Sequence, residues 1–313
     1  MRTRPVCSSA MARWTGVLRV ALDDPGGPLF KIAVSLRLSS STALAGTGNS
    51  VIEELSDSGN IARLLVSKLG GSDAAVNAWV VDAASFSGSF AVYKEFVPSV
   101  DSRGDPLGYD PEGLPASRSI VSLFSKCIRQ VTGVIGAGRQ ESAAAHAHPR
   151  TVLLGFSKGG IVLNQILSEI SSITSDSLAC SLGGRTSAED SIFPASEGRF
   201  LRSISAFHFV DVGLNRAGAY LTDASAVGRI VEIFRLWDSS KVVRFVLHGT
   251  PRQWRDSRRP WIRREKARLA QLLREEEAGD GRGTVSIQEV LYFPTTAPSL
   301  QMHFEIIEAM QLG

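Results

Sequence analysis

The stretch GFSKG (155–159) has the residue types and spacing that could hold a serine nucleophile. An apolar run typical of a strand comes directly before it, and an apolar pattern with helical spacing follows at 160–170. Between a strand and a helix, such a serine sits in a sharp, strained turn that projects its Oγ at the carboxyl edge of a sheet. We expect Gly155 and Gly159 to be required, because any side chain there would collide with the neighbouring strand or helix. The pattern therefore predicts Ser157 as a nucleophile, with a purely structural turn as the alternative.

A serine nucleophile needs backbone N–H groups that stabilise the oxyanion formed during its attack. The first donor would be the amide of Lys158, at the N-terminus of the helix that follows the serine. A second donor is expected from a loop after an earlier strand. The Gly-rich stretch LAGTGNS (44–50) follows such a strand and contains Gly46. We therefore predict an oxyanion hole built by the amides of Lys158 and Gly46.

The serine also needs an imidazole base, which follows both the serine and the acid along the chain in this type of site. Four histidines precede Ser157 or lie within or at the end of strand patterns, where a structural role is expected: His146, His148, His208 and His248. His303 follows the strand pattern 285–293 and opens the C-terminal helix, so its ring would lie at the same edge of the sheet as Ser157. His303 is therefore the predicted base, and a structural histidine at a helix start is the alternative.

Two aspartates compete for the acid that orients the imidazole. Asp256 lies in the loop after the strand pattern 242–249, which is the more common place for this acid, although the surrounding arginines also suit an exposed ion pair. Asp211 stands directly at the end of the strand pattern 203–210, from which some lipases supply the acid. The pattern favours Asp256 and leaves Asp211 open.

Alternating strand and helix patterns place these residues in an α/β fold with a mostly parallel central sheet and helices on both faces. The strand patterns are 31–38, 78–86, 150–156, 203–210, 242–249 and 285–293. The helical patterns are 57–69, 119–131, 160–170 and the amphipathic segment 255–277. The Pro- and Gly-rich segment 98–117 is expected to be a long surface loop, and 136–149 a linker.

The N-terminal segment 1–25 differs in composition from the rest of the chain. It contains several arginines and no acidic residue before Asp23, which is typical of a mitochondrial targeting segment. An ordinary basic, disordered start is the alternative. We expect residues 26–313 to form a single domain.

Composition narrows the classes of function. The chain has 34 Lys+Arg, 31 Asp+Glu and a net charge of +3, so no nucleic-acid partner is expected. No apolar run approaches the roughly 18 to 20 residues that a membrane span needs. The motifs include no cofactor fingerprint and no metal-ligand spacing, so we expect neither. The expected partner is a small-molecule or acyl substrate, and no motif indicates a protein partner.

Four longer stretches carry a family resemblance: LLGFSKGGIVLNQIL (153–167), FVDVGLNRAGAYLTD (209–223), HGTPRQWRDSRRPWI (248–262) and FPTTAPSLQMHFEII (293–307). They resemble the α/β-hydrolase-like family whose human member is the mitochondrial protein chromosome two open reading frame sixty-nine. The resemblance spans roughly residues 57–310 and implies an α/β-hydrolase core with serine hydrolase activity on an unassigned substrate. It also implies residence in the mitochondrial matrix, with the cytoplasm as the alternative. By position it carries Ser157, Asp211, Asp256 and His303, without choosing between the two acids.

The chain departs from this family ahead of the nucleophile. Relatives have a Phe-Pro-Gly-Asp-like loop that would complete the oxyanion hole, and nothing between residues 30 and 55 spells it. A missing donor lowers turnover by about 100-fold or more. The sequence predicts a serine hydrolase that cleaves an ester or thioester. The alternative is a catalytically inactive hydrolase fold that serves as a binding or scaffold protein in mitochondria.

Overall fold

The computed structural model describes most of the chain in seven stretches. These are residues 14–21, 29–36, 49–70, 76–135, 150–174, 193–279 and 283–312. Gly46, the linker 136–149 with His146 and His148, and most of the N-terminal segment 1–25 lie outside the described residues.

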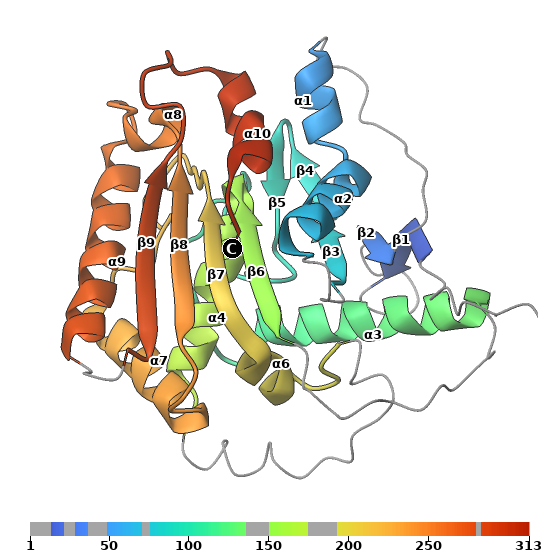
Figure 1. Ribbon diagram of the computed structural model, residues 1–313, viewed down its shortest axis with the longest axis horizontal. Helices are drawn as coiled ribbons and strands as arrows, with labels where there is room; N and C mark the ends of the chain where they lie inside the picture. The colour runs from blue at the N-terminus through green and yellow to red at the C-terminus, as the bar shows by residue number, and fades with distance from the viewer. Residues whose placement is uncertain are drawn as a thin grey trace, which may run out of the picture.

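The central element is a four-stranded parallel sheet in the order β6-β7-β8-β9 (Figure 1). Its strands are β6 (Thr151–Phe156), β7 (Ile204–Val210), β8 (Val243–Gly249) and β9 (Val285–Leu291). All four lie where the sequence predicts them, with ends displaced by no more than two residues. The register pairs Phe156 with Val210 and Val210 with His248, so the carboxyl ends of the first three strands lie level.

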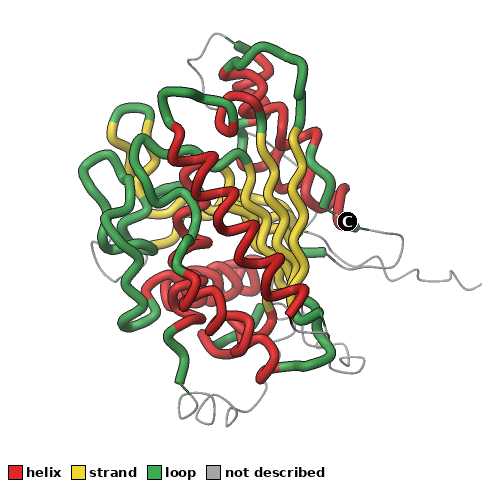
Figure 2. Tube along the Cα trace, turned by 90° about the vertical axis from the view of Figure 1, so that its left-hand side faces the viewer, coloured by secondary structure: helices red, strands yellow, loops and turns green. Residues whose placement is uncertain are grey.

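Helices cover both faces of this sheet (Figure 2). One face packs against α3 (Pro115–Ile135), α4 (Gly160–Ser171), α7 (Ala224–Trp237) and α9 (Pro260–Gly279). The other face packs against α2 (Ser58–Leu69) and α10 (Leu300–Ala309). Because successive side chains of a strand point to opposite faces, Phe209 enters the first core and Val210 the second. The predicted α/β class, with a parallel sheet between helices, is confirmed.

A second, antiparallel sheet has the order β1-β2-β3. Its strands are β1 (Trp14–Ala21), β2 (Leu29–Leu36) and β3 (Ala78–Val81), and α2 packs against β2 and β3. β1 lies within the segment 1–25 and pairs with β2 along its full length. An Arg-rich, acid-poor composition does not prevent this, because strand pairing satisfies backbone groups whatever the side-chain charge.

The hairpin of β4 (Ser85–Ser87) and β5 (Phe90–Val92) precedes the Pro- and Gly-rich segment. As expected, residues 98–114 of that segment contain neither helix nor strand. The prediction that it lies on the surface is wrong for its middle, because Gly104, Asp105 and Pro106 are buried. Gly104 has a φ of 73°, and a Cβ on it would lie 2.6 Å from the carbonyl oxygen of Ala91 in β5. α3 begins at Pro115, earlier than predicted, because proline suits the first turn of a helix.

Short helices complete the described part of the chain. They are α1 (Ser50–Leu55), the 3₁₀ turn η1 (Ser157–Gly159), α6 (Glu197–Ser203) and α8 (Pro251–Trp254). Within the described stretches, none of the helices combines the length and apolar character needed to cross a bilayer.

Candidate active site

Ser157 occupies a tight turn at the carboxyl end of β6. Its φ is 52°, in the left-handed region that is unfavourable for a residue with a Cβ. The turn η1 runs directly from this serine into α4. Ser157 is partly exposed, and its hydroxyl forms no hydrogen bond with another described residue. This local geometry, a strained serine between a strand and a helix, is the one that a nucleophile turn requires.

The crowding predicted at the glycines around Ser157 is present at Gly155 and absent at Gly159. A Cβ on Gly155 would lie 2.8 Å from the carbonyl oxygen of Gly159 and 2.9 Å from Cα of Gly160, so no side chain fits. A Cβ on Gly159 would meet nothing within 4 Å, which corrects the expectation that this position must be glycine for lack of space. The second crowded position is Gly160, where a Cβ would lie 2.5 Å from a methyl group of Val212. The close approach therefore involves Gly155 and Gly160, and Gly159 is open.

Gly155→Ala is expected to lower the free energy of unfolding by about 2–3 kcal/mol, because the crowding atoms belong to the backbone. Gly159→Ala is the matched control, since its φ of −58° is helical and alanine favours that conformation by about 1 kcal/mol. Chemical unfolding of the two variants and of the wild type measures both changes. An equal loss in both variants would contradict the assignment of the close contact to Gly155.

His303 and Asp211 contact each other in the interior. Nδ1 of His303 lies 2.7 Å from Oδ2 of Asp211, and both side chains are buried. Asp211 directly follows β7 and, like Ser157, has a positive φ, here 44°. Since Phe156 pairs with Val210, the serine and the aspartate are neighbouring strand-end residues. A carboxylate on Nδ1 makes that nitrogen the N–H donor and leaves Nε2 of the neutral ring as an acceptor.

Thr250 holds the Asp211 carboxylate in place. Its backbone N–H donates to Oδ1 at 2.7 Å, and its hydroxyl donates to Oδ2 at 3.0 Å. The N–H of Asp211 itself donates to the carbonyl oxygen of His248, 2.8 Å away. Sequence patterns alone did not single out Thr250, although its place directly after β8 puts it beside the end of β7.

Asp256 does not occupy the position that the sequence favours. Its carboxylate accepts hydrogen bonds from the side chains of Arg258 and Arg259, at 3.4 and 2.9 Å. The pKa of Asp256 is lowered, because these charge-assisted bonds outweigh its desolvation. The structure thus corrects the preference for Asp256, since Asp211 is the aspartate that contacts His303. Asp256 instead forms ion pairs with Arg258 and Arg259, the alternative that the surrounding arginines suggested.

His303 lies in the first turn of α10, three residues later in the helix than predicted. The helix begins at Leu300, and the Ser299 hydroxyl caps it by accepting from the N–H of Met302. The imidazole stacks on the Phe156 ring, with the ring centroids 4.7 Å apart and an interplanar angle of 30°. Phe156 directly precedes Ser157, so this contact brings the predicted base next to the nucleophile turn.

The two predicted oxyanion donors have different outcomes. The amide of Lys158 lies within the first helical turn after β6, where N–H groups have no partner in the preceding turn. The Lys158 side chain is buried and forms an ion pair with Asp105, at 3.0 Å. Gly46 lies outside the described residues, so the predicted second donor has no described position.

His208 and His248 are buried in the sheet, as expected for structural histidines. Nδ1 of His208 lies 2.9 Å from Nε2 of His248, and Nδ1 of His248 lies 3.0 Å from the hydroxyl of Tyr292. Burial lowers the pKa of His208 to about 3, with smaller effects of His248 and Arg244. Burial alone lowers the pKa of His248 to about 4. Both rings are therefore neutral at physiological pH.

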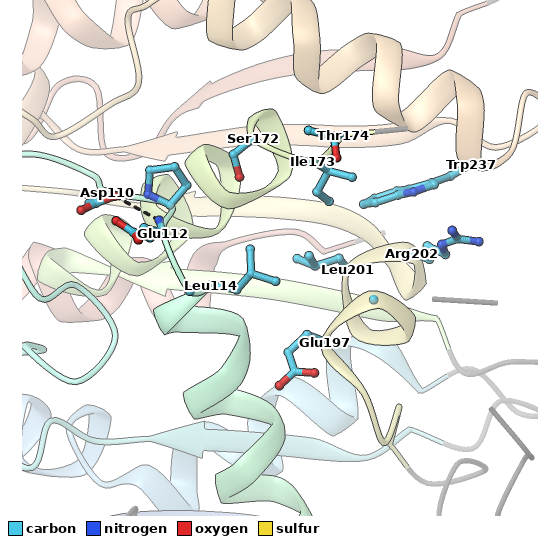
Figure 3. Close-up of a pocket in the computed structure, with 13 residues that line it drawn as sticks. Asp110, Glu112, Leu114, Ser172, Ile173, Thr174, Glu197, Leu201, Arg202 and Trp237 are labelled. Carbon is cyan, nitrogen blue, oxygen red and sulfur yellow. Dashed lines mark hydrogen bonds between the residues drawn. The ribbon is translucent and has the colours of Figure 1, made fainter. Parts of the chain in front are cut away.

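A pocket of about 520 Å³ lies at the other edge of the sheet (Figure 3). Leu201 and Arg202 line it just before β7 begins, and Trp237 lines it at the end of α7, ahead of β8. These residues precede the strands, whereas Ser157 and Asp211 follow them. The pocket is therefore separate from the candidate active site.

Comparison with known proteins gives a match over the middle of the chain. Residues 122–279, about half of the chain, match the C2orf69 family. The chain belongs to the C2orf69 family. The matched residues include Ser157 and both aspartates, whereas His303 lies beyond them.

Two curated members of the C2orf69 family match at 28% identity. "Mitochondrial protein C2orf69 homolog" of Danio rerio matches over 157 residues, which is 50% of this chain and 36% of that protein. "Mitochondrial protein C2orf69" of Homo sapiens matches over 156 residues, which is 50% of this chain and 32% of that protein. The matching region thus spans about a third of the length of these relatives. No solved structure matches this chain.

Proposed function

We propose that this chain is a serine hydrolase of the α/β-hydrolase type that cleaves an ester or thioester. The observation that carries the proposal is the buried hydrogen bond between His303 and Asp211 beside a strained, accessible Ser157. A strand-end serine, a strand-end acid and a later histidine are the parts that serine hydrolysis needs, in the chain order of this fold. The names of the two C2orf69 relatives support a mitochondrial location.

The proposed reaction begins when Ser157 Oγ attacks the carbonyl carbon of the substrate. Nε2 of His303 takes the hydroxyl proton, while Asp211 holds the ring by Nδ1 and stabilises the imidazolium. The amide of Lys158 donates to the oxyanion. The imidazolium then returns the proton to the leaving alcohol or thiol, and water releases the acyl group by the same route in reverse.

A catalytically inactive binding protein of the same fold is the second candidate. Two observations favour it: the Ser157 hydroxyl forms no hydrogen bond with His303, and residues 30–55 do not contain the Phe-Pro-Gly-Asp-like loop of the relatives. In unliganded serine hydrolases this hydrogen bond is often long, which leaves the first candidate the better supported of the two.

Covalent labelling with a fluorophosphonate separates these two functions. The wild type is expected to be labelled and Ser157→Ala is not, because only an activated serine attacks the phosphorus centre. An established serine hydrolase in the same tube reports that the probe is reactive. Absence of label on folded wild type, beside a labelled control enzyme, would reject the hydrolase and leave the binding protein.

A further inference from the structure

Lys158 carries a second feature, in its side chain, that the proposed chemistry does not use. The ammonium group is buried, with 7% of the side chain exposed, and pairs with the carboxylate of Asp105, which is 2% exposed. It also donates a hydrogen bond to the carbonyl oxygen of Arg103 and lies 5.1 Å from the centre of the Phe90 ring. The ammonium group therefore has two polar partners in this segment, an ion pair with Asp105 and a hydrogen bond to the backbone of Arg103.

The partner, Asp105, belongs to a segment that is itself tightly organised. Its N–H donates to Oδ1 of Asp101, which also accepts from the N–H of Arg103. Gly104 packs its backbone on β5, and the N–H of Leu107 donates to the carbonyl oxygen of Ser99. The segment 99–107 is therefore internally ordered, so its ion pair can restrict the movement of Lys158.

Asp105 also reaches the loop that follows the triad acid. Its Oδ2 accepts from Nδ2 of Asn215 at 3.4 Å, four residues after Asp211. One carboxylate thus contacts both the residue after the nucleophile and the loop after the acid. The pair lies between the two strand-end turns whose relative position the reaction depends on.

Buried ion pairs contribute little to stability by themselves. Replacing both partners by apolar groups of similar volume is often neutral, whereas removing one partner is strongly destabilising because it leaves an unpaired charge. Geometric specificity is the property that such a pair can add. At Lys158, the pair would fix two positions: that of the backbone N–H of Lys158, which would face the oxyanion, and that of Ser157, one residue earlier.

We propose that the Lys158–Asp105 ion pair is a positioning device that fixes the segment 99–107 onto the nucleophile turn and holds Ser157 Oγ and the Lys158 amide in reactive geometry. This inference rests on the proposed function. The two side chains are positioning groups, because neither contacts the reacting atoms. A displacement of about 1 Å at such a site slows reaction by about 100-fold.

The test measures fluorophosphonate labelling of three variants as a rate constant and as a final labelled fraction. Asp105→Asn removes one charge, and Lys158→Met combined with Asp105→Leu removes both without leaving an unpaired charge. Both variants are expected to be labelled to completion, but about 10- to 100-fold more slowly than the wild type. The limiting rate constant is expected to fall, and the affinity for the probe to stay unchanged.

Glu169→Gln is the control: this buried carboxylate caps α3 through the N–H groups of Ala116 and Ser117, at the far end of α4. It is expected to lower stability and leave the rate constant unchanged.

A merely structural pair would give another result. Destabilisation lowers the labelled fraction and leaves the rate constant of the folded molecules alone, so a double variant labelled at the wild-type rate overturns the inference. If the wild type itself is not labelled, the proposed function fails, and hydrogen exchange of residues 157–160 decides the positioning role. Faster exchange in the folded double variant than in the wild type supports that role, and equal exchange rejects it.

Discussion

Asp211→Asn is expected to slow fluorophosphonate labelling of Ser157 by about 10³- to 10⁴-fold, as loss of the orienting carboxylate does in serine proteases. The asparagine Nδ2 would take the place of Oδ2, 2.7 Å from Nδ1 of His303, and would donate where the carboxylate accepts. The imidazole would then carry its proton on Nε2, which could no longer accept the proton of the serine. Asparagine tolerates the positive φ of this residue, so the backbone is expected to be retained.

Asp256→Asn is the matched control, because both aspartates satisfy the sequence pattern. Its carboxylate pairs with arginines that are partly or largely exposed, and such pairs contribute about 0–1 kcal/mol to stability. Labelling within about 3-fold of the wild type is expected for this variant. A large loss in Asp256→Asn with none in Asp211→Asn would refute the assignment of Asp211. Thermal unfolding of both variants shows whether any loss follows from unfolding.

The buried histidine pair is expected to make the fold sensitive to acid. His208 and His248 have folded-state pKa values of about 3 and about 4, whereas an unfolded histidine has a pKa of about 6.5. Below about pH 6.5 the unfolded chain binds protons that the folded chain excludes, so stability falls as the pH falls. Each ring is expected to contribute a loss of about 2 kcal/mol between about pH 7.5 and about pH 5. The pair therefore accounts for about 4 kcal/mol over this range.

His208→Leu isolates this effect, because Arg244 and His248 are the charged or titratable groups that act on His208. Unfolding free energies of wild type and variant are measured at several pH values in that range. The loss on acidification is expected to be about 2 kcal/mol smaller in the variant. Glu169 and Glu265, whose pKa burial raises, act in the opposite direction in both proteins and cancel in the difference. Parallel pH profiles for the two proteins would show that His208 is protonated in the folded state.

Much of the fold follows from local patterns. The four parallel strands and α4, which follows β6, lie within a few residues of their predicted positions, because apolar periodicity and helix-ending residues act over short distances. No helix was predicted at α7, between β7 and β8. The turn at Ser157 can also be predicted from local patterns, since strand, serine and helix are consecutive in the sequence. No strand was predicted at β1, because residues 1–25 were set apart by their composition.

The loop before α3 has a property, its burial, that local sequence patterns do not predict. Its prolines and glycines predict the absence of helix and strand, and that prediction is confirmed. They carry no information on burial, which depends on a lysine more than fifty residues later reaching Asp105. The crowding at Gly160 is likewise set by Val212, in the loop after β7.

The sequence by itself determined the α/β class, the serine turn and the order of serine, aspartate and histidine. It favoured Asp256 and left Asp211 open, because both follow predicted strands and both precede His303. Only the tertiary structure decided, by docking α10 on the face of the sheet where His303 meets a residue 92 positions earlier. The physical reason is desolvation: Asp211 is buried with Thr250 and His303 as its hydrogen-bond partners, whereas Asp256 turns to arginines at the surface.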